Sequence, residues 1–224
     1  MPRYKGVIFD FNGVLIFDSL WQEKSWQKVL SRLSGKSIDL KKVRVLVHGK
    51  TVSEVLEEFL NRPLDKKELD LLTKEKELYY QQLCLSEKEN FKLVDGANHI
   101  LNWLKIVDIP VTIATSASRL NMEFYFKHLK LSQWFNWDLI VYDDGNLRSK
   151  PSPEPYIVAS KKLNLKPSDC IVIEDSEAGI KSAKKAGIGY IIAMAGERKP
   201  TRYIKKNANI IIKDLSELPI KFKK

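Results

Sequence analysis

Short apolar runs separated by helical patterns are the feature that most limits the folds open to this chain of 224 residues. Each run has the length of a buried strand. They lie at residues 6–11, 111–115, 139–142, 170–174, 190–193 and 208–212. Between the later runs, amphipathic helices are predicted at residues 98–106, 119–129, 153–163 and 176–186. This alternation predicts an α/β fold, in which helices cover both faces of a parallel sheet.

Residues 18–92 interrupt the alternation. Helical patterns fill most of this stretch, at residues 21–33, 51–60 and 65–85. The only candidate strand in it is residues 43–47. We therefore predict a helical domain at 18–92, inserted into a core domain made of residues 1–17 and 93–224.

Composition points to an ordinary globular chain, with 44% hydrophobic and 29% charged residues. No apolar run reaches the roughly 20 residues that a membrane span requires. The first residues lead into a strand pattern, and no signal peptide is predicted. Cys84 and Cys170 have no metal-ligand or redox spacing, so both are expected to be reduced core residues. We expect a cytoplasmic monomer.

The net charge of +10 raises the alternative of a nucleic-acid-binding protein. Residues 197–224, however, carry nine Lys or Arg and three Asp or Glu, which is most of the excess. That stretch contains no base-reading motif. A solvated basic surface is the favoured interpretation, with a modest attraction for anionic substrates as a secondary effect.

Polar side chains follow the predicted strands at the positions where ligands bind in a parallel sheet. Carboxylates suit Mg²⁺, which prefers oxygen ligands, while lysine and hydroxyl groups suit a phosphoryl group. The carboxylates are Asp10, Glu174 and Asp175, and the side-chain amide of Asn12 follows two residues after Asp10. The phosphoryl-binding candidates are Thr115, Ser116, Ser118 and Lys150.

Each of these residues also has an ordinary structural interpretation. Asp175 could cap a helix, Ser116 and Ser118 could lie in turns, and Lys150 could be a surface lysine. The three histidines, at positions 48, 99 and 128, share no metal-ligand spacing. The order and placement of the strand-end groups together favour a shared site.

Four segments resemble the motifs of the haloacid dehalogenase superfamily, in the right order and across essentially the whole chain. They are FDFNGVL, ATSAS, SKPSPEPY and VIEDSEAGIKSAKKAG. The fourth motif, with the helical insert, resembles the β-phosphoglucomutase and phosphatase branch. The resemblance implies a Rossmann-like core and a helical cap. HGKTVSEVL resembles the cap loop of that branch, which makes His48, Gly49 and Lys50 candidate substrate-binding residues.

The resemblance also implies roles for the motif residues. Asp10 would attack the phosphoryl group and become an aspartyl phosphate. Mg²⁺ would be held by Asp10, by Asp175, by the main-chain carbonyl of Asn12 and, directly or through water, by Glu174. Ser116 and Lys150 would bind the phosphoryl oxygens. Thr115 is the alternative to Ser116, because the sequence does not fix where the strand ends, and Ser118 is a further substrate-binding candidate.

Asn12 departs from the family pattern, which has an aspartate at this position. That aspartate protonates the leaving oxygen and then activates water, whereas asparagine cannot exchange a proton in this way. The leaving group of the natural substrate could need little protonation or supply its own acid, or a cap residue such as His48 or Glu23 could replace the aspartate. The asparagine could also be a deliberate substitution that traps a complex. Gln22, where relatives often carry a histidine, favours a divergent natural sequence.

The leading expectation is a Mg²⁺-dependent phosphohydrolase acting on a small phosphomonoester, which a sugar phosphate would satisfy. Two alternatives remain: a β-phosphoglucomutase-like phosphomutase, and a phosphosugar-binding protein whose catalysis Asn12 has weakened. A dehalogenase would use the same nucleophile without a metal, but the paired acids Glu174 and Asp175 favour the metal-dependent chemistry.

Overall fold

The computed structural model describes residues 4–47, 50–144, 146–196 and 199–218. The chain divides into two compact units. One consists of Met1–Phe17 and Lys92–Lys224, and the other of Asp18–Phe91.

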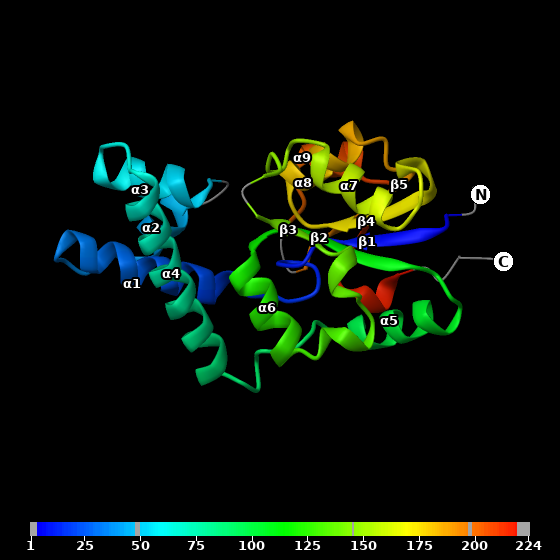
Figure 1. Ribbon diagram of the computed structural model, residues 1–224, viewed down its shortest axis with the longest axis horizontal. Helices are drawn as coiled ribbons and strands as arrows, with labels where there is room; N and C mark the ends of the chain where they lie inside the picture. The colour runs from blue at the N-terminus through cyan, green and yellow to red at the C-terminus, as the bar shows by residue number, and fades with distance from the viewer. Residues whose placement is uncertain (1–3, 48–49, 145, 197–198, 219–224) are drawn as a thin grey trace. The chain divides into compact units, whose positions relative to one another are not determined.

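A six-stranded sheet forms the centre of the first unit (Figure 1). Every strand pairs in parallel with its neighbours, in the order β3-β2-β1-β4-β5-β6. The strands are β1 (Gly6–Phe9), β2 (Val111–Ser118), β3 (Val141–Asp143), β4 (Cys170–Glu174), β5 (Tyr190–Met194) and β6 (Ile210–Ile212). The expected α/β fold is confirmed.

The chain's first strand lies in the middle of this sheet. Ile8 of β1 is opposite Thr112 of β2 on one side and Val172 of β4 on the other. All four residues of β1 are buried, which explains its continuous apolar sequence. Because β1 and β4 run in parallel, their carboxyl ends deliver their next residues to the same edge of the sheet.

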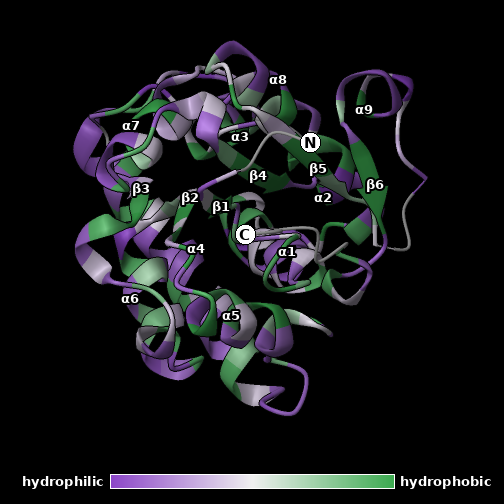
Figure 2. Ribbon diagram, turned by 90° about the vertical axis from the view of Figure 1, so that its right-hand side faces the viewer, coloured by the Kyte–Doolittle hydropathy of each residue, from purple (hydrophilic) through white to green (hydrophobic). Residues whose placement is uncertain are grey.

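Helices cover both faces of the sheet (Figure 1). On one face lie α7 (Glu154–Lys162), α8 (Glu177–Lys185) and α9 (Arg202–Asn207). Their buried side chains pack with Ile8 and Val172 in a single core cluster. The other face is covered by α5 (Ala97–Ile106) and α6 (Arg119–His128). Figure 2 shows β4 and β5 mostly in green, the colour of hydrophobic residues, as two-sided burial requires.

In its described residues the second unit contains helices joined by short loops, and no strand. Its helices are α1 (Ser19–Ser34), α2 (Leu40–Val47), α3 (Val52–Leu60) and α4 (Lys66–Ser86). Their shared core consists of Trp26, Leu30, Val43, Val55, Leu56 and Leu72. Thr51 begins α3 with a capping box, since its side chain accepts from Glu54 N and its own N–H donates to Glu54.

The candidate strand at residues 43–47 is wrong, because this segment belongs to α2. Val43 alone of the segment is fully buried, while Val45 is 79% exposed. A single buried side chain per helical turn replaces the alternation that a strand would need. The packing of Val43 against α1 and α3 thus overrides the strand preference of the valines.

No helix in the described part of the chain is long and apolar enough to cross a membrane. Cys84 and Cys170 are both buried and unpaired by disulfide. Burial raises the pKa of each thiol to about 12, so neither is a ready nucleophile at neutral pH.

Candidate active site

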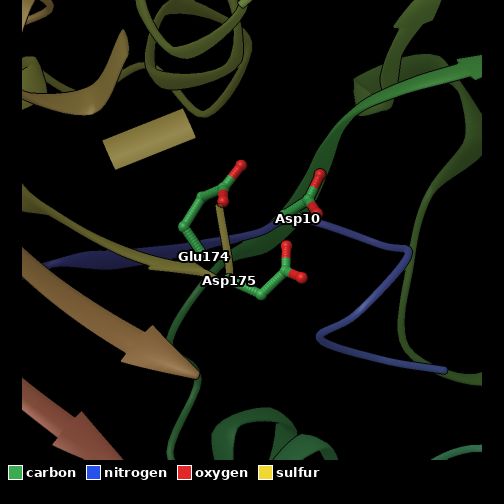
Figure 3. Close-up of side chains that lie close together, drawn as sticks. All are labelled: Asp10, Glu174 and Asp175. Carbon is green, nitrogen blue, oxygen red and sulfur yellow. The ribbon is translucent and has the colours of Figure 1, made fainter. Parts of the chain in front are cut away.

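Three carboxylates meet where β1 and β4 end. Asp10 follows β1 directly, Glu174 is the last residue of β4, and Asp175 comes next. A hydrogen bond of 2.9 Å from Asp10 N to Ile173 O extends the pairing of the strands to this point. Figure 3 shows the three side chains converging. One oxygen from each lies within 4.8 Å of the others, and Asp10 and Glu174 are buried.

Lys150 supplies the positive charge among these carboxylates. Its side chain is only 6% exposed. The ammonium group donates hydrogen bonds to Asp10 Oδ1 at 2.7 Å, Glu174 Oε1 at 2.8 Å and Ala114 O at 3.0 Å. Although burial opposes its charge, Asp10 and Glu174 hold the pKa of Lys150 well above its usual value. Lys150 is therefore a permanent cation at neutral pH.

The single positive charge of Lys150 does not neutralise all three carboxyl groups of the cluster. Burial raises the pKa of Asp10 to about 8, and repulsion from Glu174 and Asp175 adds to the rise that Lys150 opposes. The site thus carries an excess of negative charge that a bound cation would relieve.

Both carboxylate oxygens of Glu174 accept hydrogen bonds from other protein groups. Oε1 accepts from Lys150 and from the Tyr156 hydroxyl at 3.2 Å, while Oε2 accepts from Ser176 N at 2.7 Å and Ser176 Oγ at 3.0 Å. Tyr156 also places its ring 4.9 Å from Lys150 Nζ. Burial, followed by the charge of Glu174, raises the pKa of Tyr156 well above 10, so its hydroxyl stays a donor. Glu174 consequently positions Lys150.

A glycine lets the loop after β1 approach Asp175. Gly13 has a φ of +87°, which side chains rarely adopt, and a Cβ at this position would overlap the Asp175 carboxylate. The glycine of the FDFNGVL segment is therefore required both by backbone conformation and by space.

The donor set fits Mg²⁺. The three groups are hard oxygen ligands, they converge, and they carry more negative charge than Lys150 neutralises. Asp10 and Asp175 are the residues that would hold the ion. Because hydrogen bonds occupy both oxygens of Glu174, its contact would run through water.

The three hydroxyl candidates at the end of β2 differ in their surroundings. Thr115 is buried, and its Oγ1 accepts from Ala117 N at 3.1 Å. Ser118 caps α6 by accepting from Asn121 N at 3.3 Å. Ser116 is exposed. Thr115 and Ser118 thus have local structural roles, which leaves Ser116 as the hydroxyl best suited to a ligand.

The cap-loop candidates belong to the helical unit. Lys50 pairs with Glu58 at 2.6 Å, while His48 and Gly49 lie outside the described residues. Glu23, a candidate replacement acid, forms two hydrogen bonds with Arg44. Gln22 bonds to Asp18 and Lys76 in the same unit.

Three residues of the site were not identified from the sequence. Tyr156 and Ser176 lie inside the SKPSPEPY and VIEDSEAGIKSAKKAG segments, so their position was a usable signal. Tyr125 accepts a hydrogen bond from Asn12 Nδ2 at 3.2 Å. It comes from α6, 113 residues away, and lies in none of the four segments.

Comparison with known proteins places this geometry in a family. A crystal structure of a HAD hydrolase, family IA, variant 3, from Entamoeba histolytica HM-1:IMSS is 34% identical, covers 96% of both chains and superposes with a TM-score of 0.89. β-Phosphoglucomutase from Clostridium difficile is 25% identical, with a TM-score of 0.78 over 98% of this chain and 95% of that one. Validoxylamine A 7′-phosphate phosphatase of Streptomyces hygroscopicus subsp. limoneus is 28% identical over 96% of each chain. The family model described as haloacid dehalogenase-like hydrolase matches residues 7–193, and the chain therefore belongs to that family.

Proposed function

We propose that the protein is a Mg²⁺-dependent phosphohydrolase that removes the phosphoryl group of a small phosphomonoester. The observation that carries the proposal is the cluster of Asp10, Glu174, Asp175 and Lys150 at one edge of the sheet. Three convergent acids around one buried lysine suit a phosphoryl group and a divalent cation together.

In the proposed reaction, an Asp10 carboxylate oxygen attacks phosphorus, and the bond from phosphorus to the alcohol oxygen breaks. The alcohol oxygen takes its proton from solvent, because Asn12 cannot supply one. Water then attacks the aspartyl phosphate, which releases inorganic phosphate and restores the carboxylate. Lys150 stays charged and holds Asp10 in place through its 2.7 Å contact. Mg²⁺, when bound, would neutralise charge on the phosphoryl oxygens. Ser116 would add a hydrogen bond to one of these oxygens.

A sugar phosphate is the proposed substrate class. Support comes from the relatives, whose names specify a validoxylamine phosphate and a phosphoglucose. The helical unit, residues 18–91, would serve as the cap that excludes bulky substrates, with Lys50 and its neighbours touching the substrate. If so, Lys50→Ala should raise KM and leave kcat nearly unchanged.

The test is phosphate release from a panel of small phosphomonoesters, with and without Mg²⁺. Asp10→Asn should abolish release. Asp169→Asn is the matched control, because Asp169 lies just before the opposite end of β4, where its side chain forms a surface pair with Lys5. Release that persists in Asp10→Asn would remove Asp10 from the nucleophile's role.

Asn12 favours one further candidate, a phosphosugar-binding protein with little turnover. Loss of acid–base help costs roughly 10²–10⁴ in rate. A phosphomutase is supported by the similarity to β-phosphoglucomutase. In the same panel, the binding protein would give saturable binding with negligible release, and the mutase would give an isomeric sugar phosphate in place of free phosphate.

A further inference from the structure

Asn12 is held by a tyrosine that none of the four motif segments contains. The Asn12 side-chain amide donates a hydrogen bond of 3.2 Å from Nδ2 to the Tyr125 hydroxyl oxygen. Asn12 follows β1, while Tyr125 lies in α6. The contact therefore joins two elements that only the tertiary fold brings together.

Packing fixes the ring that carries this hydroxyl. Tyr125 is fully buried, and its ring stacks on Phe11 with centroids 4.4 Å apart and an interplanar angle of 22°. Phe124 packs against it at 5.8 Å in an edge arrangement. Rotation of the ring would break these contacts, so the hydroxyl stays in one place.

A fixed hydroxyl constrains the orientation of residue 12. The nitrogen and oxygen of a carboxamide point in different directions, so a bond from Nδ2 to Tyr125 turns Oδ1 elsewhere. A phenol can accept from an amide and can also donate to a carboxylate. The same hydroxyl would therefore orient either asparagine or aspartate at this position.

We propose that Tyr125 is the positioning residue for residue 12, holding its side chain in the orientation used at the leaving oxygen. This proposal rests on the proposed function, since it concerns the same reaction. It accounts for how Asn12 keeps a defined orientation after losing its proton-transfer chemistry. It also predicts that an aspartate restored at residue 12 depends on Tyr125.

The experiment is a four-member cycle: the parent protein, Asn12→Asp, Tyr125→Phe and the double variant. Phenylalanine keeps the stacking on Phe11 and removes only the hydroxyl. We expect Asn12→Asp to raise kcat roughly 10²–10⁴-fold with Tyr125 present. Without the hydroxyl the gain should be about tenfold smaller, as loss of one hydrogen bond implies, with KM within about twofold. Equal gains in both backgrounds would overturn the proposal.

Tyr4→Phe is the matched control. It also removes one hydroxyl bond, to Gly189 O at 3.1 Å, and keeps its ring contact with Tyr190. It should leave the gain from Asn12→Asp intact. If Tyr4→Phe reduced the gain as much as Tyr125→Phe does, the effect would reflect stability alone.

A second measurement does not depend on turnover. In ¹⁵N-labelled protein, the side-chain amide signal of Asn12 is the one that disappears in Asn12→Asp. Its hydrogen exchange should be several-fold faster in Tyr125→Phe and unchanged in Tyr4→Phe. An unchanged exchange rate in Tyr125→Phe would overturn the positioning role. Absence of phosphate release from the parent protein and from Asn12→Asp would instead count against the proposed function.

Discussion

Gly179 in α8 lies directly against the carboxylate of Glu174, so a methyl group at residue 179 would overlap both carboxylate oxygens. We expect Gly179→Ala to displace Glu174 and, with it, the bond to Lys150. Overpacking of this kind costs about 1–3 kcal/mol in the free energy of unfolding. Phosphate release should fall at least tenfold, because a displaced Lys150 no longer holds Asp10. Urea unfolding and activity assays measure the two effects.

The control for this substitution is Gly187→Ala. Gly187 has a φ of +75° and nothing within 4 Å of its would-be Cβ. Alanine there should cost about 1–2 kcal/mol through backbone strain alone. The rate of phosphate release by Gly187→Ala should match that of the parent protein under conditions in which both proteins are folded. Equal activity in both alanine variants would contradict the role assigned to Glu174.

Lys150→Met should strongly lower the free energy of unfolding, because it leaves Asp10 and Glu174 buried without their cation. Removing one partner of a buried pair costs about 3–5 kcal/mol. The loss should grow as pH rises toward and through 8, where Asp10 of the parent protein ionises and depends on the charge of Lys150. Lys162→Met is the matched control, since Lys162 donates its hydrogen bonds to the backbone carbonyls of Asp138 and Ile140 and not to a buried carboxylate. A control that destabilises as strongly as Lys150→Met would show that charge balance is not the cause.

The raised pKa of Asp10, about 8 in the folded protein, predicts opposite pH trends with and without Mg²⁺. Between its unfolded pKa of about 3.9 and its folded value, the folded state binds more protons than the unfolded state. Metal-free stability should therefore fall as pH rises toward and through 8. Mg²⁺ requires the ionised carboxylate, so its binding should strengthen over the same range and release a proton.

Thermal unfolding from about pH 6 to about pH 9, with and without Mg²⁺, measures both trends. Asp10→Asn should remove the part of each trend that belongs to residue 10. Stabilisation by Mg²⁺ that is independent of pH in the parent protein would count against Asp10 as a ligand.

The sheet could be predicted from sequence because its inner strands, such as β1 and β4, are buried on both faces. Such strands are continuous apolar runs, and residues 170–174 coincide with β4. The valines of α2 could not be assigned in this way, because strand preference and helical packing conflict there. The difference is one of context: two-sided burial gives a continuous apolar run, whereas the alternating valines of α2 fit a strand as well as a short helix with one buried side chain.

The residues of the candidate site also differ in whether the sequence could identify them. Asp10, Lys150 and the paired acids could be identified because parallel strands deliver their next residues to one edge. The partner of Asn12 could not, because the contact depends on how α6 packs on the sheet. A tyrosine inside an amphipathic helix has the same sequence pattern whether its hydroxyl serves a site or only packs.

The helical unit contains its own buried ion pair, which yields a prediction independent of the active site. Lys76 Nζ lies 3.1 Å from Glu77 Oε1, and the side chains are 5% and 8% exposed. Lys76→Met should cost about 3–5 kcal/mol, because the Glu77 carboxylate stays buried without its cation. Replacing both residues by methionine should cost less than the single change, since no uncompensated charge remains.

Arg32→Met is the control for this pair. Arg32 of α1 pairs with Glu75 of α4, the helix that contains Lys76 and Glu77, but the two side chains are 49% and 28% exposed. Exposed pairs contribute about 0–1 kcal/mol, so this variant should unfold close to the parent midpoint. Urea unfolding of all three variants gives the comparison. If the double variant proved less stable than Lys76→Met alone, Glu77 would have to stabilise the helical unit through contacts other than its pairing with Lys76.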